Sequence, residues 1–148
     1  MTANLANSPD SENAITYHWP VRIYYEDTDA AGVVYHSNYL NYMERARTEY
    51  LRSAGFSQAK LDKELGVVFV VANLCINFLA PAQFDDMLDV NCRIIHAGGS
   101  KFEFEQSIIN STGKLLCTAK INIVCVDSST FRPKRIPQQI KAKLNYDN

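Results

Sequence analysis

The sequence lacks any apolar run that approaches the ~18 residues needed to cross a membrane. Its polar residues 1–13 also lack the apolar stretch of a signal peptide. Net charge is nearly absent, because 15 Lys and Arg residues stand against 16 Asp and Glu residues. Such a balance disfavours a surface for nucleic acid or anionic membranes. We therefore expect a cytoplasmic protein that spans no membrane and binds no nucleic acid.

Metal-binding motifs are also missing. The four cysteines show no C-x-x-C spacing, and no His or acidic residue completes a zinc-finger spacing around them. Each lies in an apolar, strand-like run: Cys75, Cys92, Cys117 and Cys125. We interpret all four as buried free thiols, which favours a reducing compartment. We interpret Asp85 and Asp86, which have no His beside them, as a loop before a strand, and we expect no metal.

The residues that are present suit one small domain. With 148 residues, 47% of them hydrophobic, the chain can form a single core without disulfides or metal. Residues 1–16 are polar and are expected to form a disordered or extended tail. The folded domain is expected to span residues 17–144.

Two kinds of periodicity divide this domain. Residues 18–26 alternate as a strand that ends at Tyr25 on its apolar face. Residues 38–54 follow helical spacing, and Gly55 stands where a helix typically ends. A shorter helix is predicted at residues 57–65. The apolar stripe expected along the long helix is Tyr39, Met43, Ala46 and Tyr50.

After Gly66 the apolar period becomes two and predicts four strands joined by short connections. One face of the first of these strands is expected to carry Val70, Ala72, Leu74, Ile76 and Phe78. Short turns and clean alternation favour an antiparallel sheet with one covered face. One long helix wrapped by such a curved sheet makes a two-layer α+β domain with the hotdog arrangement.

The segment 24–39, Y-Y-E-D-T-D-A-A-G-V-V-Y-H-S-N-Y, leads from the first strand into the long helix. Tyr25, Asp27, Asp29 and His36 lie around Gly32, in a loop of the kind that carries catalytic groups. The N-terminus of a helix supplies unpaired N–H groups for an oxyanion. A carboxylate beside them can attack a carbonyl or activate water. A thioester suits this arrangement because thiolate leaves readily.

The motif D-T-D-x-x-G-V-V-Y-H-x-x-Y, followed by M-E-R-A-R-T-E-Y-L, resembles the 4-hydroxybenzoyl-CoA thioesterase group of hotdog proteins. Within that group it is most similar to the Tol–Pal-associated, YbgC-type acyl-CoA thioesterases. The resemblance runs from about residue 21 to residue 140. It implies hydrolysis of acyl-CoA without a cofactor or metal, CoA being part of the substrate and a product.

The resemblance also implies roles for individual residues. Asp29 corresponds to the catalytic carboxylate, as nucleophile or as base for water, and Asp27 is interpreted as structural. His36 and Tyr25 are the accompanying catalytic candidates. The backbone N–H groups of His36 and Tyr35 are the expected oxyanion donors. The expected substrate-binding residues are Lys101, Arg135 and Tyr39. Sites are expected to form across a dimer, with dimers pairing into tetramers, and acyl carrier protein is a possible partner.

Other interpretations remain open at this point. Asp29 could serve only to form an Asx turn before the helix, and Tyr25 could be the last core aromatic residue of its strand. The domain could be a hotdog hydratase or dehydratase acting on acyl thioesters. It could instead be a scaffold that binds acyl carrier protein in envelope biogenesis. Analysis of the reaction product would separate these functions.

Overall fold

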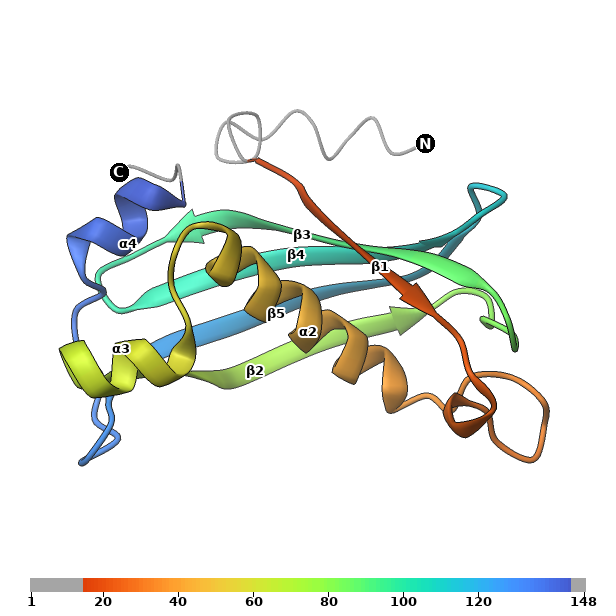
Figure 1. Ribbon diagram of the computed structural model, residues 1–148, viewed down its shortest axis with the longest axis horizontal. Helices are drawn as coiled ribbons and strands as arrows, with labels where there is room; N and C mark the ends of the chain where they lie inside the picture. Colours follow the sequence, from red (N-terminus) through yellow and green to blue (C-terminus); the bar gives the residue numbers. More distant parts are fainter. Residues whose placement is uncertain (1–14, 145–148) are drawn as a thin grey trace.

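A five-stranded antiparallel sheet forms one layer of the protein, and a long helix lies across one face of it (Figure 1). The computed structural model describes residues 15–144, so most of the predicted tail 1–16 lies outside the described residues. The sheet has the strand order β1-β3-β4-β5-β2. The elements are β1 (Tyr17–Arg22), the 3₁₀ helix η2 (Tyr25–Asp27), α2 (Asn38–Ser53), α3 (Gln58–Leu65), β2 (Val67–Phe78), β3 (Met87–Ala97), β4 (Lys101–Asn110), β5 (Leu115–Asp127) and α4 (Gln138–Lys143). This is the predicted α+β hotdog arrangement.

Helix α2 presents its predicted apolar stripe to the sheet. Tyr39, Met43, Ala46 and Tyr50 are all buried, with exposed fractions between 0% and 6%. The helix packs against β1 and β3, and these residues join the inward side chains of β3, β4 and β5 in one hydrophobic core. Among the described residues, no helix is long and apolar enough to span a membrane.

Strand β1 ends earlier than its alternation predicts. The predicted strand reached residue 26, but β1 ends at Arg22 and Tyr25 begins a 3₁₀ helix. The cause is Asp27, whose carboxylate accepts a 2.7 Å hydrogen bond from the backbone N–H of Tyr24 and turns the chain. Tyr25 is consequently 77% exposed and stacks on Phe84, with ring centroids 3.9 Å apart. The interpretation of Tyr25 as a core residue was wrong.

The edge strand β2 has only β5 as a neighbour among the described residues. Leu74, Ile76 and Phe78 face α2, because their partners on β5 are buried inward residues. Cys75 points the other way and is exposed, whereas the other three cysteines are buried. The prediction of four buried thiols was therefore wrong for Cys75.

A bulge between Val71 and Asn73 changes which side chains of β2 face the helix. One extra residue in a strand reverses the alternation beyond it. Phe69 and Val71 therefore face α2, since they too pair with buried residues of β5. The prediction that Val70 and Ala72 share a face with the end of β2 was wrong for this reason.

Candidate active site

The segment between η2 and α2 folds into a tight hairpin. Thr28 and Val34 form an antiparallel bridge, and the N–H of Asp29 donates to the carbonyl of Val33 at 3.0 Å. The turn closes with a 2.9 Å bond from the N–H of Gly32 to the carbonyl of Asp29. Gly32 has φ +83°, a left-handed conformation that favours glycine. The hairpin places Asp29 opposite the strand that leads into α2.

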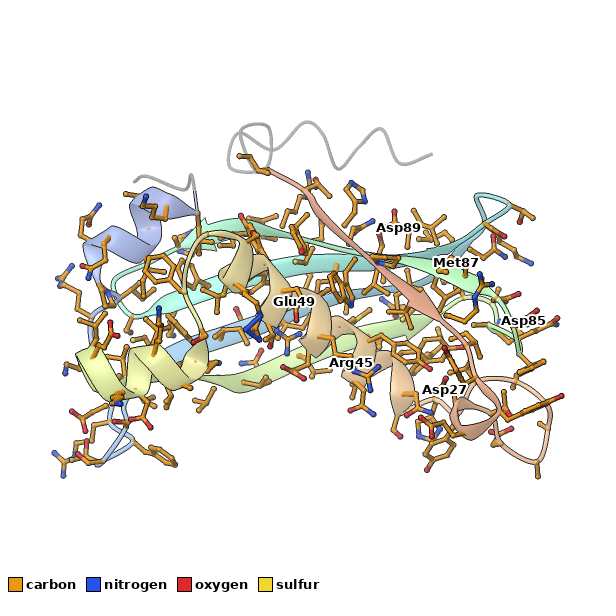
Figure 2. All side chains as sticks on the ribbon, in the orientation of Figure 1. Asp27, Arg45, Glu49, Asp85, Met87 and Asp89 are labelled. Carbon is orange, nitrogen blue, oxygen red and sulfur yellow. The ribbon has the colours of Figure 1, made fainter. Side chains whose placement is uncertain are left out.

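A second loop, residues 79–86, holds this hairpin in place. The N–H of Val34 donates to the carbonyl of Ala82 at 2.9 Å, and Val33 bridges Gln83. The N–H of Ala82 in turn donates to the hydroxyl of Tyr39 at 3.0 Å. Figure 2 shows Asp27, the last residue of η2, and Asp85, from the second loop, toward the same end of the molecule. The sequence carried no local signal for this contact, because it joins residues far apart in the chain.

The main-chain carbonyl of Asp27 binds two residues at the start of α2. Its carbonyl accepts hydrogen bonds from the N–H of Tyr35 and from the side-chain amide of Asn38, both at 2.9 Å. Its carboxylate is already engaged by the N–H of Tyr24. The prediction that Asp27 satisfies backbone donors of the loop is confirmed.

Asp29 presents an exposed carboxylate close to the first turn of α2. Its Oδ1 accepts a 2.9 Å hydrogen bond from the N–H of Ala31, so the Asx turn foreseen as an alternative is present. Within residues 15–144, its Oδ2 makes no hydrogen bond. Burial raises the pKa of Tyr39, and the charge of Asp29 is one of the smaller causes that raise it further.

The two backbone N–H groups expected to hold an oxyanion differ in availability. That of Tyr35 already donates to Asp27. That of His36 donates no hydrogen bond to any part of the described chain. His36 directly precedes Ser37, the N-cap of α2, so its N–H lies next to the unpaired N–H groups of the helix start, which carry partial positive charge. Its imidazole is exposed and lies edge-on to Phe78, with ring centroids 6.3 Å apart.

Of the three expected substrate-binding residues, Tyr39 contacts the loop that holds the Asp29 hairpin, whereas Lys101 and Arg135 are not brought to Asp29. Tyr39 is 4% exposed, and its hydroxyl accepts the bond from Ala82, so it is a packing residue in the single chain. Lys101 and Arg135 are exposed at the β3–β4 turn, at the other end of the sheet (Figure 1). Strand β3, with 11 residues, separates the two ends by roughly 33 Å at ~3.3 Å per residue.

Comparison with known proteins agrees with the fold. The model of the thioesterase-like superfamily matches residues 23–144. The chain belongs to this superfamily. The chain is 45% identical over 132 residues to the acyl-CoA thioester hydrolase YbgC of Escherichia coli O6:H1, covering 89% of this chain and 98% of that protein. It is 42% identical over 130 residues to the acyl-CoA thioesterase YbgC of Haemophilus influenzae, covering 88% and 95%.

Solved structures give the same family. A probable thioesterase from Bartonella henselae superimposes on this thioesterase with a TM-score of 0.79 at 37% identity, covering 83% of this chain and 100% of that one. The resemblance to YbgC-type proteins and the hotdog fold, both predicted from the sequence, are confirmed.

Proposed function

We propose that this thioesterase hydrolyses acyl-CoA thioesters to a free carboxylic acid and CoA, with Asp29 as the catalytic carboxylate. The names of its relatives support the reaction. The observation that carries the residue assignment is the pairing at the start of α2. There an exposed carboxylate with an unbonded oxygen lies near a helix N-terminus whose His36 N–H is unbonded within the described chain.

The proposed mechanism uses the His36 N–H as the oxyanion donor, assisted by the partial positive charge of the helix start. The N–H of Tyr35 is not proposed as an oxyanion donor, because it already donates to the carbonyl of Asp27. Asp29 either attacks the thioester carbonyl, giving a mixed anhydride whose acyl carbon water then attacks to free Asp29, or takes a proton from a water molecule that attacks directly. In both routes the CoA thiolate leaves and the oxygen of water ends in the acid.

Tyr25 and the His36 side chain are proposed to orient the substrate at the rim of this site. Both are exposed, and Tyr25 is held flat against Phe84. No metal or cofactor is needed for this chemistry. Acyl carrier protein thioesters are an alternative substrate class with the same reacting bond. The proposed location is the cytoplasm, which the four free thiols support.

A second copy of the chain is proposed to complete the site. The outer edge of β2 is unpaired in the described chain, and Val71, Leu74 and Phe78 along it are 46%, 38% and 50% exposed. Antiparallel pairing of two β2 edges would bring the end of one sheet that carries Lys101 and Arg135 beside the Asp29 end of the other. These cations would then be placed to bind CoA phosphates. The proposed pairing of two such dimers into a tetramer follows from the family resemblance.

The test is release of free thiol from a panel of acyl-CoA esters by wild type and Asp29→Asn. We expect the variant to lose nearly all activity and to unfold at the wild-type temperature. Asp62→Asn, an equally exposed change on α3, is the matched control and keeps full activity. Activity in Asp29→Asn equal to wild type would rule out the assignment. Addition of water to an enoyl-CoA without thiol release would identify a hydratase instead.

A further inference from the structure

A cavity of about 240 Å³ lies between α2, α3 and the sheet, away from the hairpin that carries Asp29. Helix α2 packs on β1 and β3, so the space above β5 and β2 is left incompletely filled. The apolar part of the lining is formed by Leu51, Phe69, Val71, Phe102, Phe104, Ile123 and Leu144. Such a lining suits a hydrocarbon chain.

Arg47 introduces a cation into this lining. Its Nη1 donates a 2.8 Å hydrogen bond to the side-chain oxygen of Gln106, a buried residue of the central strand β4. No carboxylate of the described residues lies within ion-pair distance of its guanidinium. Glu44 also lines the cavity, but it is exposed and accepts a hydrogen bond from the hydroxyl of Thr48.

A largely buried cation that no carboxylate contacts directly is unfavourable, because water no longer solvates it fully. Burial accordingly lowers the pKa of Arg47, and the nearby charge of Glu44 offsets part of this effect. A ligand that brings a carboxylate into the cavity would receive charge-assisted hydrogen bonds from the remaining guanidinium N–H groups. A purely aliphatic ligand would leave these N–H groups of the guanidinium without a hydrogen-bond acceptor.

A row of apolar side chains on β2, called the track below, lies between the proposed thioester position and this cavity. Phe78, at the end of β2, lies beside the His36 ring. From there Ile76, Leu74 and, beyond the bulge, Val71 face α2 and lead to the cavity wall. Figure 1 shows α2 and β2 running in opposite directions on this side of the molecule. The bulge in β2 brings Phe69 and Val71, in place of Val70 and Ala72, to this face.

The length of this track sets the size of the acyl group. Arg47 follows the first residue of α2 by nine positions, which corresponds to roughly 14 Å at 1.5 Å per residue. An extended chain advances about 1.2 Å per bond. Because helical side chains lean toward the N-terminus, the guanidinium lies closer to the thioester than its Cα does. An acyl chain of about six to ten carbons therefore spans the distance.

We propose that this cavity binds the far end of a medium-length acyl chain that carries a terminal carboxylate, with Arg47 as its partner. The substrate class is thus the CoA thioester of an α,ω-dicarboxylic acid. This inference rests on the proposed hydrolysis at Asp29 and deepens it. Arg47 acts here as a specificity residue and takes no part in breaking the thioester bond.

The first test compares kcat/KM for matched pairs of CoA esters that differ only at the far end: hexanoyl with adipoyl, octanoyl with suberoyl, and decanoyl with sebacoyl. In wild type we expect kcat/KM for the carboxylate-ended ester to be about tenfold higher in at least one pair. This factor corresponds to about 1.4 kcal/mol, which is less than a hydrogen bond to a charged group usually contributes. Arg47→Met should reduce this ratio to one or below. Arg47→Lys should keep part of it.

The control is Arg45→Met, because Arg45 is exposed on the same helix and lies over the ring of Tyr42. It should keep the wild-type ratio. A wild-type ratio of one in all three pairs, with active hydrolysis, overturns the dicarboxylate inference and leaves the proposed function standing. Absence of hydrolysis for every ester overturns the function itself.

A binding measurement independent of activity completes the test. Monomethyl suberate, which has one free carboxylate, should raise the thermal unfolding temperature of wild type more than methyl octanoate, which has none, at equal concentration, because a ligand of the native state stabilises it. The difference should vanish in Arg47→Met. Equal shifts from the two esters in wild type would show that the cavity does not recognise the carboxylate.

Discussion

The main-chain N–H of Tyr35 donates a 2.9 Å hydrogen bond to the carbonyl of Asp27. Two adjacent N–H groups at the start of α2 thereby acquire different roles. The first fastens the hairpin to η2, and the second, on His36, has no partner in the described chain. A donor that needs no rearrangement before it meets an oxyanion is the kind that lowers a barrier most effectively. The carbonyl of Tyr35, which shares a peptide unit with the His36 N–H, accepts a 2.9 Å hydrogen bond from the N–H of Asn38 and so fixes the orientation of that donor.

Gly32 is the residue on which the hairpin geometry depends most directly. Its φ of +83° is strained for residues with a Cβ, although a Cβ there would meet nothing within 4 Å. We expect Gly32→Ala to lower the free energy of unfolding by about 1–2 kcal/mol and to reduce kcat/KM for acyl-CoA at least tenfold, because Asp29 moves. Urea denaturation and a thiol-release assay measure the two effects.

Gly113 provides the matched control for that substitution. Its φ is +86°, a Cβ there also meets nothing within 4 Å, and it lies in the β4–β5 turn. Gly113→Ala should show a similar loss of stability and no loss of kcat/KM. If both variants lose activity equally, the effect of Gly32→Ala is general destabilisation and the hairpin argument fails.

Asp127, at the end of β5, makes stability depend on pH. Hydrogen bonds from the hydroxyl and N–H of Ser129 and from the N–H of Thr130 lower its pKa to about 2, with a smaller contribution from Lys134. In the unfolded chain the pKa is about 3.9. The stabilising contribution is therefore fully present above about pH 4 and is lost as the pH falls through 2.

The measurement is the free energy of unfolding of wild type and Asp127→Asn between pH 6 and pH 2. The difference in favour of wild type should shrink over the lower half of this range. Ser129→Ala should narrow the pH range over which this difference changes. It removes the hydrogen bond from the Ser129 hydroxyl, which is the largest cause of the lowered pKa of Asp127. A difference that does not change with pH would contradict the assignment.

Regular periodicity explains why much of the fold could be predicted. The stripe of α2 and the inward faces of β3 to β5 follow from spacing alone, and they are buried as expected. The bulge at Val71 could not be predicted, because it depends on the register with β5. The burial of Arg47 could not be predicted from the sequence either. Its burial depends on Gln106, 59 positions away, and beside the helical stripe it was indistinguishable from a surface ion-pairing residue.

The reactivity of the cysteines tests whether Cys75, on the edge strand β2, is exposed while the other three cysteines are buried. Cys75 is exposed, whereas burial raises the pKa of the Cys92 and Cys117 thiols to about 12. Only thiolate reacts readily with alkylating reagents. We expect one fast-reacting thiol per native chain at pH 8, and none in Cys75→Ser. Mass spectrometry after brief alkylation counts them. Two or more fast-reacting thiols would show that the core around β5 opens.

The separation of Lys101 and Arg135 from Asp29 within one chain makes the shared site testable by complementation. In a two-fold dimer with composite sites, one chain supplies Asp29 and the other supplies the cations. We would mix Asp29→Asn with the double variant Lys101→Glu, Arg135→Glu under conditions that exchange subunits. Each mixed dimer then contains one site with both defects and one site with none.

Random mixing should restore about a quarter of wild-type activity from two nearly inactive parents. If the cations served the Asp29 of their own chain, every site would carry one defect and mixing would restore nothing. Recovery therefore distinguishes a substrate held between two chains from one held by a single chain.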